Sequence, residues 1–175
     1  AIHIATACGQ EDIAARANKA RAMSMIWLQD HEEALSLLRD LADQCRERGD
    51  ESLCAECLHL MTLCASNMRR LDEARAYSDL TLAAFAELSN YDHLVVALIG
   101  RGIIERRAWK NDAALEYFER ARRIVDDHAL HSQVAILMSS IAVVHMDTGR
   151  YDACLQALEE SISFGYRMSD SARLF

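Results

Sequence analysis

The side chains best suited to metal or redox chemistry are cysteines and a histidine between residues 54 and 64. Cys54 and Cys57 form the only C-x-x-C motif of the sequence, and His59 and Cys64 follow closely. A structural zinc site usually takes four such ligands, but at helical spacing His59 and Cys64 lie on different sides of the helix. Cys57 and Cys64 also repeat positions that small or apolar residues hold elsewhere. We therefore expect buried thiols rather than a metal or redox site.

A second cluster contains His128 and His131, which follow Asp126 and Asp127. Imidazole and carboxylate groups on one face could chelate a metal. The cluster lies where a helix is expected to end, so we interpret it as a polar cap. The sequence therefore predicts no metal and no cofactor.

Motifs of common catalytic sites are missing from the sequence. It has no Gly-rich phosphate loop, no H-E-x-x-H and no G-x-S-x-G. Its carboxylates fall mostly on expected outer faces or at helix starts, where charge usually serves solubility. We expect no catalytic residues and no enzyme activity.

The charge balance limits the classes of partner. Twenty-seven acidic residues against 19 Lys and Arg give a net charge of −8, whereas nucleic-acid and anionic-membrane binders need basic surfaces. Arg70, Lys110 and Arg150 recur 40 residues apart, each just before an acidic residue. We interpret them as a solvated edge with weak ionic contacts between neighbouring units, not as a phosphate-binding track. The sequence predicts no direct binding to nucleic acid or membrane.

The composition favours a compact all-helical protein. Of 175 residues, 51% are hydrophobic, none is Pro and six are Gly, which is enough apolar content for a core. The longest apolar stretches, 94–99 and 134–146, are too short to span a bilayer.

Six dispersed cysteines do not match a disulfide-stapled scaffold, so we expect reduced thiols and a cytoplasmic protein. The chain begins with Ala and has no secretory signal, and we interpret it as a piece of a longer protein.

The elements that must position any site follow from an internal repeat of 40 residues. When the sequence is shifted against itself by this length, four kinds of column align without a gap. These are a small column (Ala34, Ala74, Ala114, Cys154), an acidic column (Glu32, Asp72, Asp112, Asp152), a polar column (Asp12, Ser52, Asp92, Ser132) and a second small column (Ala22, Thr62, Gly102, Ala142).

The pattern of each 40-residue unit predicts two helices. The polar column suits N-caps of the first helix, and the acidic column suits the positively polarised start of the second helix. In the first unit, Asp30 and Glu33 also fit a capping box. We expect turns at 29–30, 69–70, 109–110 and 149–150. The second helices should end near Gly9, Gly49, Ser89, Ala129 and Ser169, and glycine suits the left-handed C′ position.

The small columns predict close contact between antiparallel helices within each pair. One hairpin cannot bury its apolar faces alone, but a stack can. We predict a single array with repeats at 12–51, 52–91, 92–131 and 132–171. Residues 1–11 would end a preceding repeat, and residues 172–175 would start a further helix.

These units resemble tetratricopeptide repeats. The motifs Gly149-x-Tyr151-x-x-Cys154-Leu155-x-x-Leu158 and Ala114-Leu115-x-x-Phe118-x-x-Ala121 are similar to the second-helix signature of that family. The period of 40 instead of 34 resembles repeats of large bacterial transcription activators, peptide-responsive regulators and cyclic-dinucleotide signalling proteins. The resemblance implies an all-α, right-handed superhelical solenoid of antiparallel helix pairs, with four full repeats and partial repeats at both ends.

The resemblance also implies a non-enzymatic interaction module of a larger bacterial signalling or regulatory protein. Its partner would be a protein or peptide segment, or another domain of the same parent, held in a concave groove lined by the first helices. Since Lys19 is followed by Met23, a clamp for chaperone tails is not expected. The alternative for any one groove residue is packing between repeats. The implied groove residues are Lys19, Met23, Ile26, His59, Leu63, Ser66, Ile99, Ile103, Arg106, Ser139, Val143 and Met146.

Two other functions stay open. One is a segment that senses a ligand or signal peptide within a transcription regulator or a cyclic-dinucleotide enzyme. The other is homotypic assembly, a homo-oligomer formed through apolar faces at the ends of the solenoid.

Several residues depart from the family pattern. Arg21, Arg101 and Glu105 occupy positions that are usually apolar or aromatic, and Asn18 replaces a usually large residue. These departures indicate either a local error of register in the first helices of units one and three or, for Arg101 and Glu105, an i,i+4 pair on a partly exposed face. Trp109 falls in a turn and either covers the core between repeats or forms an exposed contact, and we favour the core.

Overall fold

The computed structural model describes residues 2–172, and side chains within 11–166. Over this range the chain is helical, with no strand. The elements are α1 (Ile2–Trp27), α2 (His31–Arg48), α3 (Glu51–Asn67), α4 (Leu71–Glu87), α5 (Tyr91–Arg107), α6 (Asn111–His128), the 3₁₀ helix η1 (His131–Gln133), α7 (Val134–Asp147) and α8 (Tyr151–Ala172). Within the described residues, no helix is long and apolar enough to cross a membrane.

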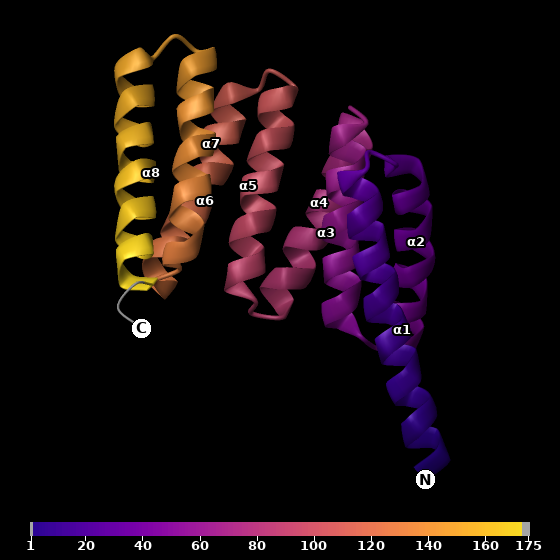
Figure 1. The fold of residues 1–175 in the computed structure, drawn as a ribbon. Helices are drawn as coiled ribbons and strands as arrows, with labels where there is room; N and C mark the ends of the chain where they lie inside the picture. The colour runs from indigo at the N-terminus through magenta and orange to yellow at the C-terminus, as the bar shows by residue number, and fades with distance from the viewer. Residues whose placement is uncertain (1, 173–175) are drawn as a thin grey trace. The chain divides into compact units, whose positions relative to one another are not determined.

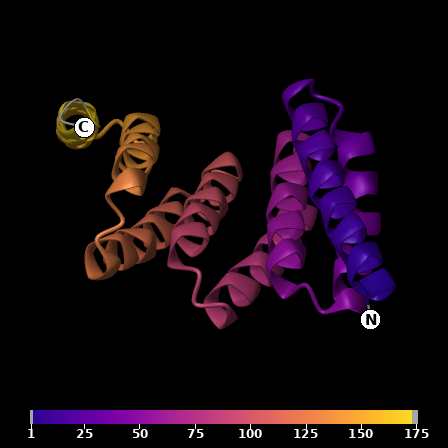
Figure 2. The same cartoon turned by 60° about the horizontal axis from the view of Figure 1, so that its bottom comes forward.

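The predicted 40-residue spacing is confirmed by the helix starts. The second helices α2, α4, α6 and α8 begin 40 residues apart, directly after the four predicted turns. The acidic column lies in the first turn of each of these helices, as predicted. Antiparallel neighbours such as α1 and α2, or α7 and α8, are seen side by side in Figures 1 and 2.

The chain packs as two compact units, 1–84 and 85–175, divided in the last turn of α4. In the first unit Leu35, Leu38 and Leu41 of α2 lie in one apolar cluster with Ile26 of α1 and Met61 of α3. In the second unit the largest fully buried side chains include Phe118, Leu98, Ile104, Leu137 and Val144. Each unit therefore has its own core, and the single array stays a prediction.

Every helix-to-helix turn from α1 to α8 uses the same backbone device. Residues 29, 49, 69, 89, 109, 129 and 149 all have positive φ, between 51° and 70°. In each case the next N–H donates to the carbonyl five residues back, for example Asp50 N to Cys45 O at 2.9 Å and Arg150 N to His145 O at 2.8 Å. This is the Schellman arrangement, which satisfies carbonyls at the helix end while the chain reverses. The predicted helix ends at Gly49, Ser89 and Ala129 are therefore confirmed.

Several predicted helix boundaries are wrong. The N-caps of α3 and α5 are Asp50 and Asn90, which accept from Leu53 N at 3.1 Å and His93 N at 3.3 Å. Ser52 and Asp92, our predicted caps, lie inside the first turns because one left-handed residue reverses the chain sooner than we expected. Ser132 lies in η1, and α7 starts only at Val134.

The predicted capping box of α2 does not form. Asp30 makes no side-chain cap hydrogen bond. Its N–H already donates to Met25 O at 2.9 Å in the turn, so no N–H is left there for Glu33 to accept from.

The predicted break between Gly9 and Asp12 is also wrong, because α1 runs unbroken from Ile2 to Trp27. Asp12 accepts from Arg16 Nε at 3.1 Å as an i,i+4 pair of a helix interior instead of capping a new helix. At the other end α8 continues past Ser169 to Ala172, and residues 173–175 lie outside the described range.

The small columns lie at close helix contacts, as predicted. Ala34, Ala74 and Ala114 are fully buried, Ala22, Thr62, Gly102 and Ala142 are buried, and Cys154 is half-buried. Gly102 shows most clearly why a small residue is needed at these contacts, since a Cβ at this position would lie 2.4 Å from Phe118 Cε1 on the facing helix. The α5–α6 contact therefore requires a residue with no side chain.

Arg101 and Glu105 form the predicted i,i+4 ion pair, with Arg101 Nε 3.0 Å from Glu105 Oε1. The predicted partly exposed face is wrong, because both residues are buried. The Arg101 guanidinium also lies 5.2 Å from the centroid of the Tyr117 ring, a cation–π distance. The ion pair and the contact with the Tyr117 ring thus give these two buried charges partners inside the helix packing.

Two glycines of α5 provide a matched test of helix contact. Gly102→Ala should lower the free energy of unfolding by about 1–3 kcal/mol, because the buried Phe118 ring must move to admit the methyl group. Gly100→Ala meets no atom within 4 Å and should raise it by up to about 1 kcal/mol through helix propensity. Urea unfolding measures both values, and equal effects of the two variants would contradict the close contact.

Two Arg–Glu pairs at i,i+4 spacing test the cost of burial. Glu105→Ala leaves the buried Arg101 without this carboxylate and should destabilise by about 3 kcal/mol. Glu119→Ala removes the partner of the exposed Arg123, 3.3 Å away, and should cost at most about 0.5 kcal/mol. Thermal or urea unfolding compares them, and a loss for Glu105→Ala no larger than for Glu119→Ala would refute the burial argument.

Candidate functional site

In the first unit, the predicted groove residues come from α1 and α3. Met23 and Leu63 occupy the same register on these two helices and remain 42% and 40% exposed. Between the helices Lys19 Nζ pairs with a carboxylate oxygen of Glu56, both half-buried. This surface, Lys19, Met23, Glu56 and Leu63, is named face 1 below.

Not every predicted residue of this unit is accessible. Ile26 and Ser66 are buried, and His59 is half-buried. Ile26 belongs to the apolar cluster of the unit. Of the predicted groove residues of this unit, Met23 and Leu63 therefore offer an exposed apolar surface to a partner.

In the second unit, the predicted residues come from α5 and α7. Ile103 and Val143 are half-buried and Met146 is exposed, whereas Ile99 is buried. Arg106 Nη1 lies 2.9 Å from Asp147 Oδ2 and joins the two first helices. This surface, Ile103, Arg106, Val143, Met146 and Asp147, is named face 2.

Ser139 is engaged with backbone and a neighbouring helix. Its hydroxyl donates to Ala135 O at 2.7 Å and lies 3.1 Å from the hydroxyl of Ser161 on α8. The Ser139 side chain therefore belongs to the contact between α7 and α8.

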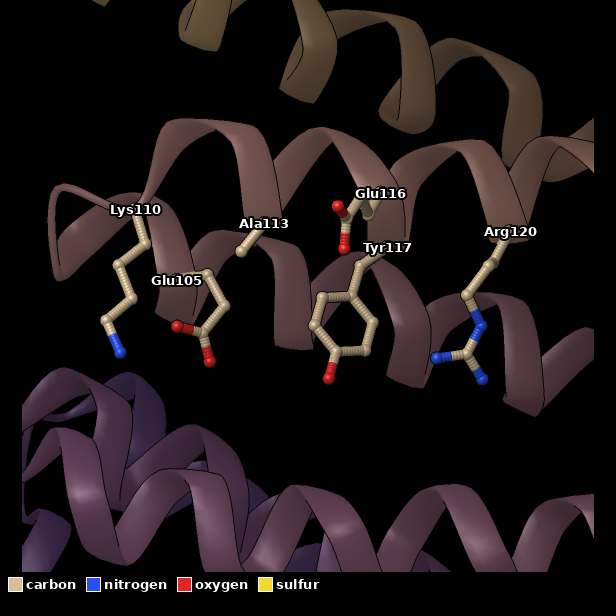
Figure 3. A pocket seen from close by; sticks show the side chains of 6 residues that line it. All are labelled: Glu105, Lys110, Ala113, Glu116, Tyr117 and Arg120. Atoms are coloured by element: carbon tan, nitrogen blue, oxygen red, sulfur yellow. The ribbon is translucent and has the colours of Figure 1, made fainter.

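A polar pocket between α5 and α6 was not predicted (Figure 3). It has a volume of about 310 Å³ and is lined by Glu105, Lys110, Ala113, Glu116, Tyr117 and Arg120. The Arg120 guanidinium lies 5.3 Å from the Tyr117 ring centroid. The pocket presents both signs of charge, so it suits polar groups rather than an apolar side chain. The unusual charges at Arg101 and Glu105 were the sequence signal that could have indicated it.

Cys57 and Cys64 are buried thiols, as predicted. Cys57 and Cys64 are fully buried and Cys54 is half-buried, and none is in a disulfide. Burial raises the pKa of Cys57 to about 12 and that of Cys64 to about 11. These thiols therefore stay protonated at neutral pH, and the thiolate form needed for redox or metal chemistry is disfavoured.

The two histidines near the end of α6 contact different aromatic rings. His128 stacks on Tyr91 with centroids 3.7 Å apart, and His131 lies 5.7 Å from the Phe164 ring. Within the part of the chain that is described, no three His, Cys, Asp or Glu side chains are placed to hold a metal ion.

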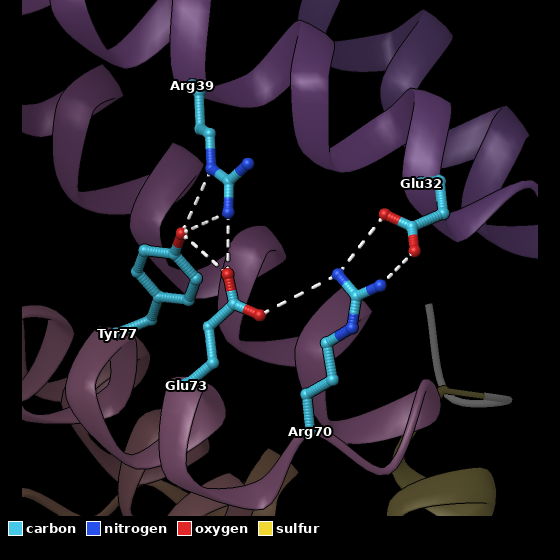
Figure 4. A network of polar contacts seen from close by, with 5 residues as sticks. All are labelled: Glu32, Arg39, Arg70, Glu73 and Tyr77. Carbon is cyan, nitrogen blue, oxygen red and sulfur yellow. Dashed lines mark hydrogen bonds and ion pairs between the residues drawn. The ribbon is translucent and has the colours of Figure 1, made fainter.

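The predicted basic edge is engaged in ionic contacts in the first unit (Figure 4). Arg70 contacts Glu32 of α2, and Arg39 Nη2 lies 2.6 Å from Glu73 Oε1 of α4. Tyr77 accepts from Arg39 Nε at 3.1 Å, and this hydrogen bond raises the pKa of Arg39. The network joins neighbouring second helices, so Arg70 is a structural contact between repeats.

Trp109 was expected to cover the core, and this expectation is wrong. Its side chain is 81% exposed and its φ is 62°. A left-handed turn residue points away from the helix contact, because the chain reverses there.

No protein-family model matches the chain, and no curated protein matches its sequence. Several solved structures share its fold, and three of them are described here. Aspartyl phosphate phosphatase F from Bacillus subtilis matches with a TM-score of 0.82 and 12% identity, over 90% of this chain and 41% of that one. A Rap protein complexed with competence and sporulation factor matches with a TM-score of 0.83 and 15% identity, over 94% and 46%.

BtubC (BKLC) from P. vanneervenii matches with a TM-score of 0.76 and 14% identity, over 90% of this chain and 65% of that one. The chain thus spans less than half the length of the first two proteins. Identities this low show the fold alone. The chain has the all-α solenoid fold of tetratricopeptide-like helical repeats that the sequence resemblance predicted.

Proposed function

We propose that the chain is a non-enzymatic module that binds a protein or peptide segment on the first helices, at face 1 and face 2. The observation that carries this proposal is the exposure of Met23 and Leu63 at one register of adjacent helices. Both are large apolar side chains next to buried positions of the small column, Ala22 and Thr62. An apolar surface of this kind favours contact with apolar side chains of a partner.

The ion pairs beside the apolar residues support the proposal. Lys19–Glu56 on face 1 and Arg106–Asp147 on face 2 each connect two first helices. They hold the apolar side chains at a defined spacing before a partner arrives, and preorganisation lowers the entropic cost of binding. The thioether of Met23 or Met146 adapts to different partner side chains.

The partner proposed here is a segment that presents apolar side chains at helical or extended spacing. One neighbour in fold is a Rap protein complexed with competence and sporulation factor, which supports a bound partner as a use of this architecture. A setting in a larger bacterial signalling or regulatory protein is part of the proposal. The net charge of −8 supports a protein partner rather than nucleic acid or an anionic membrane.

The variant Leu63→Glu tests partner binding at face 1. Peptides selected from a displayed random library against the wild-type chain serve as probes, and fluorescence anisotropy measures their Kd. Leu63→Glu should raise Kd about tenfold or more, because a charge is then placed in an apolar contact worth at least ~1.4 kcal/mol. Met146→Glu tests face 2 in the same assay.

Leu80→Glu is the matched control. Leu80 is 56% exposed and lies on the second helix α4, so it receives the same chemical change away from the first helices. Its Kd should stay within about twofold of wild type. Binding that survives Leu63→Glu and Met146→Glu, or is lost with Leu80→Glu, places the binding surface elsewhere and rejects the proposal.

A further inference from the structure

A small pocket lies between α6, η1, α7 and α8, all within the second unit. Its volume is about 220 Å³, smaller than the sites that hold drug-sized ligands, which begin at about 300 Å³. Val125 of α6 and Leu137 and Met138 of α7 line it and are buried, and Phe164 of α8 lines it and is half-buried. This space, named the α6–α8 pocket, therefore offers an apolar surface to a group the size of one large side chain.

Charged side chains line the same pocket. Arg122 Nη2 lies 3.3 Å from Glu160 Oε1, so this guanidinium already has an acidic partner. Asp126 also lines the pocket and is exposed, and within the described residues it has no ion pair. With His131 counted as neutral, two carboxylates and one guanidinium give the lining an excess of one negative charge. The unpaired carboxylate of Asp126 therefore suits a cationic group.

The connection from α6 to α7 brings His131 to this pocket. The helices α3 and α5 begin after a capping Asp or Asn, whereas the equivalent residue before α7 is Leu130, which has no side-chain oxygen to accept from the helix. Residues 131–133 form the 3₁₀ helix η1 instead of a first α-helical turn. The His131 ring centroid lies 5.7 Å from that of Phe164, so η1 and α8 each contribute a ring to the lining.

The opening of the pocket does not depend on a repeat beyond α8. Glu160 and Phe164 of α8 correspond, one repeat earlier, to Arg120 and Ile124 of α6. A complete helix pair, α7 with α8, follows α6 in the same unit, and yet Arg120 is exposed and Ile124 is half-buried. These two positions of a second helix therefore stay in contact with solvent when another repeat follows.

We propose that the α6–α8 pocket binds a primary ammonium group carried on a compact apolar body. The apolar body lies against Leu137, Met138 and Phe164, and the ammonium group pairs with Asp126. The face of an aromatic ring also attracts a cation. An anion, in contrast, would meet the carboxylates of Asp126 and Glu160. The same ligand chemistry occurs in a free arylalkylamine and in a lysine side chain of a partner.

Three small probes test the ligand chemistry on the ¹⁵N-labelled whole chain by NMR titration. 2-Phenylethylamine should shift backbone amide signals around Asp126, His131 and Phe164 with a Kd of about 1–10 mM, as expected for about nine non-hydrogen atoms. 2-Phenylethanol should bind at least about fivefold more weakly, because it lacks the charge-assisted contact, and 3-phenylpropionate should not bind. An alcohol that binds as tightly as the amine, or an amine that causes no saturable shift at these residues, refutes the proposal.

Two adjacent acidic residues provide matched variants. Asp126→Asn keeps the side-chain shape and removes the charge, so it should raise the Kd of the amine about fivefold and leave that of the alcohol within about twofold. Asp127→Asn removes the same charge from a residue that is not among the side chains lining the pocket, and should change neither Kd. Both side chains are exposed, so both variants should fold like wild type. Equal effects of the two variants on the amine would overturn the assignment of Asp126.

A blocked lysine, N-acetyl-lysine methylamide, distinguishes the two sources of the ammonium group. If it binds more tightly than 2-phenylethylamine, the source is a lysine of a partner, and the reverse order identifies a free amine. Failure of both probes to bind overturns the site. Leu63→Glu and Met146→Glu should leave both Kd values unchanged, because neither residue lines the pocket. A failure of this inference and a failure of partner binding at face 1 or face 2 are therefore distinguishable.

Discussion

The architecture depends on one backbone constraint, a left-handed residue every 20 positions from 29 to 149. After each of these residues, the N–H of the next residue donates to the carbonyl five residues before it and closes the helix end. Because the reversal takes so few residues, consecutive helices must lie antiparallel and at close range. The strain of five non-glycine residues at positive φ is tolerated because the hydrogen bonds and the helix packing on both sides compensate for it.

Short turns alone would leave the sideways spacing of the helices undefined. Ion pairs about 40 residues apart in sequence connect equivalent helices of successive repeats. Lys19–Glu56 and Arg106–Asp147 join first helices, whereas Arg39–Glu73 and Arg122–Glu160 join second helices. Ion pairs that remain in contact with solvent add little stability individually. These pairs fix the position of each helix relative to the equivalent helix of the next repeat. The pairs between first helices thereby hold the apolar side chains of face 1 and face 2 at a set distance from their neighbours.

The same repeat geometry accounts for face 1 and face 2. A first helix has one side toward its own partner helix and another toward the preceding repeat, and the remaining side carries Met23 or Leu63. Face 1 and face 2 lie on that remaining side.

Local features of the amino-acid order were enough to predict the period, the helix pairs, the second-helix starts and the small residues at helix contacts. Periodicity and side-chain size act within one or two turns of helix, so they can be read without coordinates. The structure alone decided that Asp50 and Asn90 are the caps, that α1 continues through Gly9 and that Arg101 with Glu105 is buried. It also decided that Ile26, Ser66 and Ile99 are covered while Met23 and Leu63 are not. Those outcomes depend on where a turn closes and which helix lies opposite, and no single stretch of residues contains that information.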